Sequence, residues 1–549
     1  MALRIEHQSN PICDTRCFAR LSGPFNGITH DPSQPYNEAI LVNQKQAFAS
    51  RNNVLWSPRF SFAWQPFGPS HNIVLRGGIG IFYDPGPDGI SFSLSSNPPL
   101  VNSFTVSGNN LTPNETTSLF KDAAASNLAF VNAFASGSTL AQIQATVPNF
   151  FPPAVAALGR RIHSPQYQRW SLQLQRAFGT STSLSIGYFG HHGIHELVQN
   201  PSANAWGFGS LPAGRCSNPI PDCAPDPRFS AVTQFDTNAI SSYNGMVISF
   251  QHRLSGWSTG LFQAHYTYGH ALDEVSNGGF STFANGARNI FSLGPQDPNH
   301  LRGSYGPADY DVRHSVNASY VWEVPVKAAL RGRGPDSLVS GWQVSGTVFA
   351  RAGLPYTVLD YLGLGNLQAK NYVGLLYAVP VGPSLSAPAC GKGAAFPFVP
   401  HPCLPAEVFV QPDGTITPNP NAFFVQAGCE TGFNAGNLPG PTGPCDGPAV
   451  SFAQGRNRFR GPGYFNTDFT IMKNTKIPGW EHATLGIGFQ FFNFFNHPNF
   501  GFPNTGLVQG LGIIFNLEQP PTSILGGGFG GFGGDVAPRM IQLKAQLQF

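Results

Sequence analysis

The sequence is poor in charge and has neither a long apolar run nor a cluster of basic residues. Charged residues make up 11% of the 549 residues, whereas roughly 25% is usual in soluble proteins. No segment reaches the roughly 18 consecutive apolar residues of a transmembrane helix. The net charge is +3 without a basic run, so the electrostatic signature of nucleic-acid binding is missing and no nucleic-acid partner is expected.

Glycine and phenylalanine are abundant instead, with 63 and 46 residues. A transmembrane β-barrel combines low charge with apolar residues that are spread over alternating strands rather than gathered in helices. Composition alone leaves two classes open. One is such a barrel, and the other is a secreted all-β protein with long loops rich in glycine and proline.

The cysteines form four close pairs in segments rich in proline, glycine and asparagine. The pairs are Cys13 and Cys17, Cys216 and Cys223, Cys390 and Cys403, and Cys429 and Cys445. Local pairs in loops predict disulfides formed in an oxidising compartment such as the periplasm, with free thiols as the alternative. A zinc site is disfavoured, because only His401 stands near a pair. The connectivity does not follow from the sequence.

The N-terminal residues Met1–His7 are not a secretory signal peptide. They carry charge within the first four positions and contain no apolar core region. The sequence therefore predicts either a cytoplasmic chain or a chain whose natural N-terminus is missing.

The last eleven residues, 539–549, alternate without a break. Ile541, Leu543, Ala545, Leu547 and Phe549 share one parity, and mostly polar residues occupy the other. Side chains of a strand point to opposite faces with period two, so this is a strand with one apolar and one polar face. Outer-membrane barrels commonly end on such a strand with a terminal aromatic residue. We therefore expect Leu543, Leu547 and Phe549 to form a signal that the barrel-assembly machinery recognises.

Similar alternating segments recur along the chain, mostly in pairs joined by tight turns. They predict eleven strands, or twelve with the weak first one: Ala2–Glu6, Arg59–Gln65, Asn72–Tyr83, Tyr167–Phe178, Ser183–Gly190, Tyr243–Arg253, Thr259–Gly269, Arg313–Glu323, Trp342–Arg351, Tyr464–Asn474, Ala483–Asn493 and the C-terminal strand. The predicted fold class is all-β, an antiparallel transmembrane β-barrel that is partial.

Short turns alternate with long connections. The long ones are 84–166, 191–242, 270–312, 352–463 and 494–538, and the joint 324–341 is the longest of the short set. Outer-membrane barrels have short periplasmic turns and long extracellular loops. This pattern places every long loop outside the cell and Phe549 at the periplasmic side. Loops of this length without structure would count against a compact soluble domain.

Aromatic and basic residues fit the same arrangement. Five tryptophans lie at or near strand ends, as interfacial girdles require: Trp56, Trp257, Trp322, Trp342 and Trp480. Arg176 and Lys473 interrupt the apolar stripes of their strands within a few residues of a short turn. A basic residue on the lipid face costs about 2–4 kcal/mol at the midplane but roughly 0–1 near the interface, where its long side chain can reach the headgroups.

No arrangement of residues predicts catalysis. His191, His192, His195 and Glu196 offer metal-ligand types, but the segment leaves a strand for a long loop, and a polar loop edge is the favoured interpretation. The glycine run 526–534 lacks the Lys-Ser/Thr of a phosphate-binding loop. No positioned nucleophile accompanies Asp309, Asp311 and His314. We expect no enzyme, no cofactor and no bound metal.

Polar residues on the strands could instead line a pathway, although every wide barrel has a polar interior. These are Arg59, Arg76, Arg169, Gln173, Gln175, Asn317 and Gln490. They leave the substrate unknown.

Several segments together resemble the barrel of TonB-dependent receptors of the Oar-like type. They are Val54–Pro66, Leu75–Asp84, Tyr305–His314, Gly461–Asp468, Phe492–Phe500 and Pro538–Phe549. The resemblance implies active uptake of a substrate across the outer membrane. It also implies contact with outer-membrane lipid and with the barrel-assembly machinery.

The chain departs from that family at its beginning. We find no TonB box, no plug domain and no carboxypeptidase-regulatory-like domain, and about half of the 22 strands of large transporter barrels. We therefore expect residues 1–549 to be the C-terminal portion of a receptor barrel, a fragment. The TonB complex would be a partner only if the missing part is present. A self-contained porin-like barrel of about twelve strands and a secreted β-rich adhesin or binding module remain as alternatives.

Overall fold

The computed structural model describes most of the strands and the segments that connect the first of them. The described residues are 1–51, 54–85, 88–101, 118–148, 150–200, 203–204, 224–256, 258–276, 301–356, 379–380, 408–410, 416–418, 423–424, 456–457, 459–460, 463–477, 479–480, 483–497, 499 and 539–549. Among them, no helix is long and apolar enough to cross a membrane.

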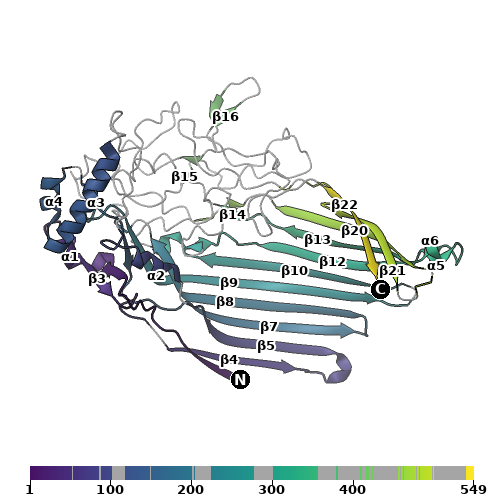
Figure 1. Cartoon of the computed structure of the whole chain (residues 1–549). Coiled ribbons are helices and arrows are strands. Elements are labelled where there is room, and N and C mark those ends of the chain that lie inside the picture. Colours follow the sequence, from purple (N-terminus) through teal and green to yellow (C-terminus); the bar gives the residue numbers. More distant parts are fainter. Residues whose placement is uncertain are drawn as a thin grey trace.

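One antiparallel sheet dominates the molecule (Figure 1). Its strands follow the chain in order: β1 (Ala2–His7), β4 (Val54–Trp64), β5 (Ile73–Tyr83), β7 (Gln166–Phe178), β8 (Thr182–Asn200), β9 (Val232–Leu254), β10 (Gly260–Asp273), β12 (His314–Val324), β13 (Trp342–Arg351), β20 (Tyr464–Lys476), β21 (Thr484–Phe492) and β22 (Met540–Gln548). All twelve predicted strands are present, including the weak first one. In the described part of the chain, β1 and β22 each pair on one side only, so the sheet is not closed.

The register aligns apolar residues into continuous rows across the sheet. One row runs over nine strands through Trp64, Leu75, Leu174, Ile186, Ile248, Tyr266, Val316, Ala350 and Phe465. A neighbouring row on the opposite face runs through Gln175, Ser185, Ser249, His265 and Asn317. The two faces of the sheet are therefore chemically distinct over the strands that both rows cross, from β7 to β12.

The exposure of these faces is the reverse of that in a soluble protein. On β7, Leu172 and Leu174 are 49% and 44% exposed, whereas Ser171, Gln173 and Gln175 are half-buried. Water-soluble sheets bury their apolar face. An apolar face that is the more exposed one over many strands fits lipid outside and a polar interior.

The short turns and the C-terminus lie at one end of the sheet (Figure 1). Among the described residues, the turn after β12 is the only one of these with α-helices, α5 (Val326–Ala329) and α6 (Asp336–Val339). A 3-10 turn, η2 (Pro69–His71), stands between β4 and β5. This arrangement agrees with the predicted periplasmic end.

A packed body, here called the cap, lies at the other end of the sheet (Figure 1). Its elements are η1 (Phe25–Gly27), α1 (Tyr36–Ala39), α2 (Asp88–Ser95), α3 (Ser118–Ser136), α4 (Leu140–Thr146), β2 (Phe18–Leu21), β3 (Ile40–Gln44) and β6 (Val155–Leu158). The prediction of a simple long loop over 84–166 was therefore incomplete, because much of this connection is helical and packed.

Helix α3 illustrates why the cap folds. Ser126, Phe130, Ala133 and Phe134 recur at helical spacing and are buried, so they form one mostly apolar stripe. Helix α4 begins with a capping box, in which Thr139 and Gln142 each accept a hydrogen bond from the other's backbone N–H. The stripe packs into a cluster with residues from β6 and from the segment before β9.

The centre of this cluster is Tyr36, which is fully buried. Its ring meets Phe130 and Phe229 edge-on, with ring centroids 4.9 and 5.9 Å away. Its hydroxyl donates to the carbonyl of Arg228 at 2.8 Å. Since Tyr36, Phe130 and Phe229 come from three connections, the cap joins segments that are distant in the chain.

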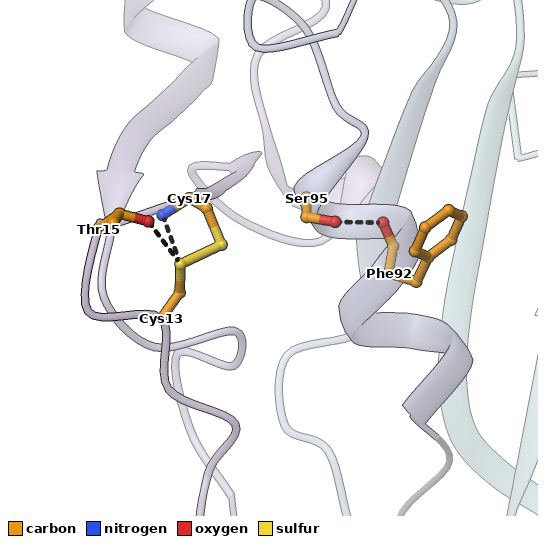
Figure 2. Close-up of a disulfide and its surroundings, with 5 residues drawn as sticks. All are labelled: Cys13, Thr15, Cys17, Phe92 and Ser95. Carbon is orange, nitrogen blue, oxygen red and sulfur yellow. Dashed lines mark hydrogen bonds between the residues drawn. A yellow bond between two sulfur atoms is a disulfide. The ribbon is translucent and has the colours of Figure 1, made fainter.

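A second cluster of the cap contains a disulfide between Cys13 and Cys17 (Figure 2). The hydroxyl of Thr15 and the N–H of Cys17 both donate to the sulfur of Cys13 at 3.2 Å. The cystine packs against a buried cluster that includes Ile90 and Leu94 of α2. The first predicted cysteine pair is thus confirmed. The other six cysteines, Cys216, Cys223, Cys390, Cys403, Cys429 and Cys445, lie outside the described residues.

The remaining elements are short. They are η5 (Leu301–Ser304), β11 (Gly306–Pro307) on β10, and three two-stranded pairs: β14 (Pro355–Tyr356) with β19 (Phe459–Arg460), β15 (Val379–Pro380) with β18 (Phe423–Phe424), and β16 (Val408–Val410) with β17 (Ile416–Pro418).

Candidate functional site

The polar face of the sheet carries all seven residues predicted to line a pathway. Cross-strand pairing puts them on one side, in neighbouring rows: Arg59 and Arg169 flank Gly80, Arg76 pairs with Gln173, Gln175 shares a row with Asn317, and Gln490 pairs with Thr470. A third row is polar over six strands, through Ser183, Gln251, Gln263, Ser319, Thr347 and Asp468. Such a face can bind and pass a hydrated solute.

A buried ion-pair network, here called the clasp, lies at the outer end of β10. Arg456 is fully buried and donates to the carboxylate of Asp273, to the Asp273 carbonyl at 3.0 Å and to Ser276 at 3.1 Å. Asp309 lies 3.4 Å from Arg456 and accepts from Asn457 at 2.6 Å. The clasp ties the connection between β13 and β20 to the outer end of β10.

Asp309 is the second buried carboxyl of the clasp. Burial raises its pKa to about 7, although hydrogen bonds from Asn457 and Ser276 act in the opposite direction. Burial also lowers the pKa of Arg456 to about 9. Asp273 is therefore the principal counter-ion of Arg456.

A second ion-pair group lies beside the clasp around Asp311. Its carboxylate pairs with Arg460, with Arg313 at 3.1 Å and with His270 at 3.4 Å. It also accepts the backbone N–H of Ala271 at 2.7 Å. Asp309 and Asp311 thus serve to hold loops together. His314 instead contacts Tyr266, with its Nδ1 2.8 Å from the hydroxyl.

The histidine segment after Gly190 is part of β8, which corrects its prediction as the edge of a loop. β8 continues to Asn200 because it pairs with the longer β9 up to that residue, with a bulge between Gly193 and Glu196. His195 stacks on His163 with ring centroids 4.4 Å apart, and His191 stacks on Tyr243. Within the described ranges, no group of three or more candidate ligands could hold a metal ion.

Aromatic residues lie at strand ends on the apolar face, as the girdle prediction requires. Trp56 is 54% exposed near the outer end of β4, and Trp480 is 58% exposed at a short turn. Trp342 donates to the carbonyl of Leu338 at 2.8 Å, and Trp322 donates to Ser258. Trp257 lies outside the described residues, as does the glycine run 526–534.

The two basic residues on the apolar face lie against aromatic rings near short turns. The Arg176 guanidinium is 4.8 Å from the ring centre of Phe178. Lys473 is 6.0 Å from the ring of Trp342 and donates to Thr475 at 3.0 Å. Both charges therefore have partners close to the turn, where the cost of a basic residue is small.

The closing strand β22 presents its predicted apolar parity on one face. Leu543 pairs with Phe489 and Leu547 pairs with Leu485 of β21. Leu543 is 66% exposed and Phe549 is 90% exposed. The geometry agrees with a lipid-facing strand, and the assembly signal stays a prediction.

Sequence reasoning missed Arg456, Arg460 and Phe82. The two arginines lie in a long connection. In a chain with so few charged residues, an arginine in such a connection is itself a signal that it has a specific partner. Phe82 stands on the polar parity of β5, opposite the apolar stripe of Ile79 and Ile81. A large ring on the wrong parity is the signal that could have found it.

An open antiparallel sheet with an exposed apolar face, a polar opposite face and all short turns at one end defines a transmembrane β-barrel protein. The chain belongs to the outer membrane beta barrel domain family, whose model matches residues 20–542. This membership confirms the predicted fold class and the predicted location in the outer membrane.

The chain is also similar to solved outer-membrane proteins at low sequence identity. The outer membrane transporter YddB from Escherichia coli matches over 91% of this chain and 41% of that one, at 8% identity and TM-score 0.40. The FrpB iron transporter from Neisseria meningitidis matches over 93% and 41%, at 9% identity and TM-score 0.34. The siderophore receptor PirA from Acinetobacter baumannii matches over 91% and 41%, at 8% identity and TM-score 0.35.

The chain spans about two fifths of the length of these solved structures. A comparison with curated protein sequences gave no match.

Proposed function

We propose that the chain is the barrel portion of a TonB-dependent receptor that takes up a substrate through the outer membrane. The observation that carries this proposal is the polar face, whose rows of hydrogen-bonding side chains run across five and six neighbouring strands. The buried carboxylates at its outer end are held in ion pairs, so the face supports passage of a solute rather than catalysis.

The open sheet supports a second element of the proposal, that residues 1–549 form part of a longer barrel. Edge strands in lipid leave unpaired backbone groups that cost several kcal/mol each. Strands of the N-terminal part of the receptor would pair with β1 and with β22. The same part would carry the plug and the segment that binds the TonB complex.

Export of the chain with an added signal peptide tests this function. Expressed alone in a Gram-negative host, the chain should reach the outer-membrane fraction without a heat-dependent shift in gel migration. Co-expression with the strands and plug encoded upstream should produce the shift and TonB-dependent uptake. A heat-dependent shift of the chain alone would indicate the self-contained porin-like barrel. Recovery as a soluble monomer would indicate the secreted module and contradict the proposal.

Leu543, Leu547 and Phe549 form the proposed signal for the barrel-assembly machinery. Deleting Phe549 should reduce the amount inserted into the outer membrane several-fold, because the exposed ring is removed from the end of β22. The amount is measured by fractionation and immunoblotting. Replacing Gln548, on the polar parity of the same strand, with alanine is the matched control and should leave insertion unchanged. Equal insertion of both variants would remove the proposed role.

A further inference from the structure

The polar face has a hollow on its outer half, between β4 and β9. Its volume is about 670 Å³, within the range of roughly 300–1,000 Å³ usual for small-molecule pockets. The lining residues used below are Arg59, Gly80, Phe82, Arg169, His191 and Tyr243. Arg59, Gly80, Arg169, His191 and Tyr243 belong to one cross-strand row, so five strands each contribute a position at the same height.

Two arginines hold one ring between them in this hollow. The guanidinium carbon of Arg59 is 4.3 Å from the ring centre of Phe82, and that of Arg169 is 5.1 Å from the same ring. Contact with the ring fixes the position of each guanidinium through cation–π attraction but leaves its N–H edge available. Phe82 therefore acts as a spacer that keeps two like charges near one another.

These arginines make no ion pair among the described residues. The Nε of Arg59 is buried and has no hydrogen-bond partner there. Strands β4, β5 and β7 together contain four arginines and no carboxylate. Arg59 is half-buried and Arg169 is exposed. A half-buried guanidinium without a counter-ion is costly, so the wall at Arg59 is electrostatically complementary to an anion.

Aromatic groups form the far side of the hollow. His191 stacks on Tyr243 with ring centroids 5.7 Å apart and an angle of 20°, and Tyr167 meets His191 edge-on at 6.2 Å. These rings offer flat surfaces next to the cationic wall. A ligand with a planar group and carboxylates would contact both.

Glycine leaves the floor of the hollow empty. A Cβ at Gly80 would lie 3.1 Å from Cγ of Arg59 and 3.2 Å from the ring of Phe82. A side chain there would crowd both groups. Glycine in the interior of a strand often marks a place where a ligand approaches the backbone closely.

The structure assigns to this hollow the binding of a small, planar, polycarboxylate ligand, with Arg59 and Arg169 as its anion-binding residues. The inference rests on the proposed function, because it takes this face to be the interior of the transport pathway. Each guanidinium donates two parallel hydrogen bonds to a carboxylate, and the planar part of the ligand packs on Tyr243 and His191.

The test uses benzene-1,3,5-tricarboxylate as the probe and isothermal titration calorimetry on the purified chain in detergent. The corresponding neutral triamide has the same shape without charge. We expect binding of the tricarboxylate that weakens as ionic strength rises and no measurable binding of the triamide. Failure of the tricarboxylate to bind, or equal binding of the triamide, would overturn the assignment.

Two variants locate the site. Removing both guanidiniums in an Arg59→Gln, Arg169→Gln variant should weaken binding by about tenfold or more, since charge-assisted hydrogen bonds are lost. Gly80→Leu keeps both arginines but fills the floor of the hollow. It should cause a similar loss of affinity for the tricarboxylate. Arg176→Gln is the matched control, because Arg176 lies on β7 but on the apolar face. The affinity of this variant for the tricarboxylate should be unchanged.

A loss of affinity in Arg176→Gln equal to that in the double variant would contradict the site. Unchanged affinity in the double variant would do the same. The measurement needs neither closure of the barrel nor uptake, so failure of the hollow to bind and failure of the proposed transport function are separate results. Secondary structure by circular dichroism confirms that each variant is folded.

Discussion

Replacing Arg456 with methionine is expected to lower the free energy of unfolding by about 3–5 kcal/mol. The substitution leaves the carboxylate of Asp273 buried without its counter-ion, and breaking a buried ion pair from one side has about this cost. Asp273 and Ser276 are 2% and 1% exposed, so water cannot replace the lost guanidinium without opening the clasp. Urea unfolding of the protein in lipid vesicles measures the change.

Arg333→Met is the matched control for this prediction. Arg333 is exposed in the short turn after β12, and its loss should change stability by less than about 0.5 kcal/mol. Neutralising Asp273 as well, in an Arg456→Met, Asp273→Asn double variant, should recover part of the loss, because the carboxylate at position 273 is then no longer buried without its counter-ion. An Arg456→Met protein as stable as the control would show that the clasp contributes nothing to the fold.

Placing an arginine on the apolar face at Ile186 is expected to destabilise the inserted protein by about 2–4 kcal/mol, the cost of this charge at the bilayer midplane. Ile186 is 44% exposed in the nine-strand apolar row. It stands four residues from the start of β8, or roughly 10 Å above the turn for a tilted strand. Unlike Arg176, an arginine at this depth cannot reach the headgroups.

Ser185→Arg is the control in the adjacent position of the same strand. Ser185 belongs to the polar row with Gln175 and Ser249, so its arginine would enter the hydrated interior at little cost. The two variants add the same charge and differ only in the face of the sheet on which the arginine stands. Unfolding in vesicles should separate them by at least about 2 kcal/mol. Equal destabilisation would mean that the two faces do not differ in environment, and the assignment of lipid and interior would fail.

The strands could be predicted because the two faces of each strand lie in different environments. Lipid on one side and a polar interior on the other impose a period of two, which is visible even in short segments such as Tyr167–Phe178. The register follows from the same pattern, since a slip of one residue would turn every side chain to the other face. This is also why the seven pathway residues could be placed on one face.

The cap could not be predicted in the same way, because its contacts join residues far apart in the chain. Tyr36 is buried by Phe130 and Phe229, and no local pattern pairs these rings. The helical spacing in α3 was present in the sequence but lay within a long connection. β8 and β9 exceed their predicted ends, Gly190 and Tyr243, because each strand supports the other. The clasp unites Asp273 with Arg456 across 183 positions.

The composite core of the cap imposes an order of events on biogenesis. Tyr36 precedes β4, Phe130 lies between β5 and β7, and Phe229 lies between β8 and β9. All three segments must cross the membrane before the core can form, so the cap folds outside the cell as a late, long-range event. Until then its aromatic residues are exposed to water. Translocation of these segments thus limits the rate at which the cap folds. Once folded, the cap opposes retraction of the early strands through the membrane.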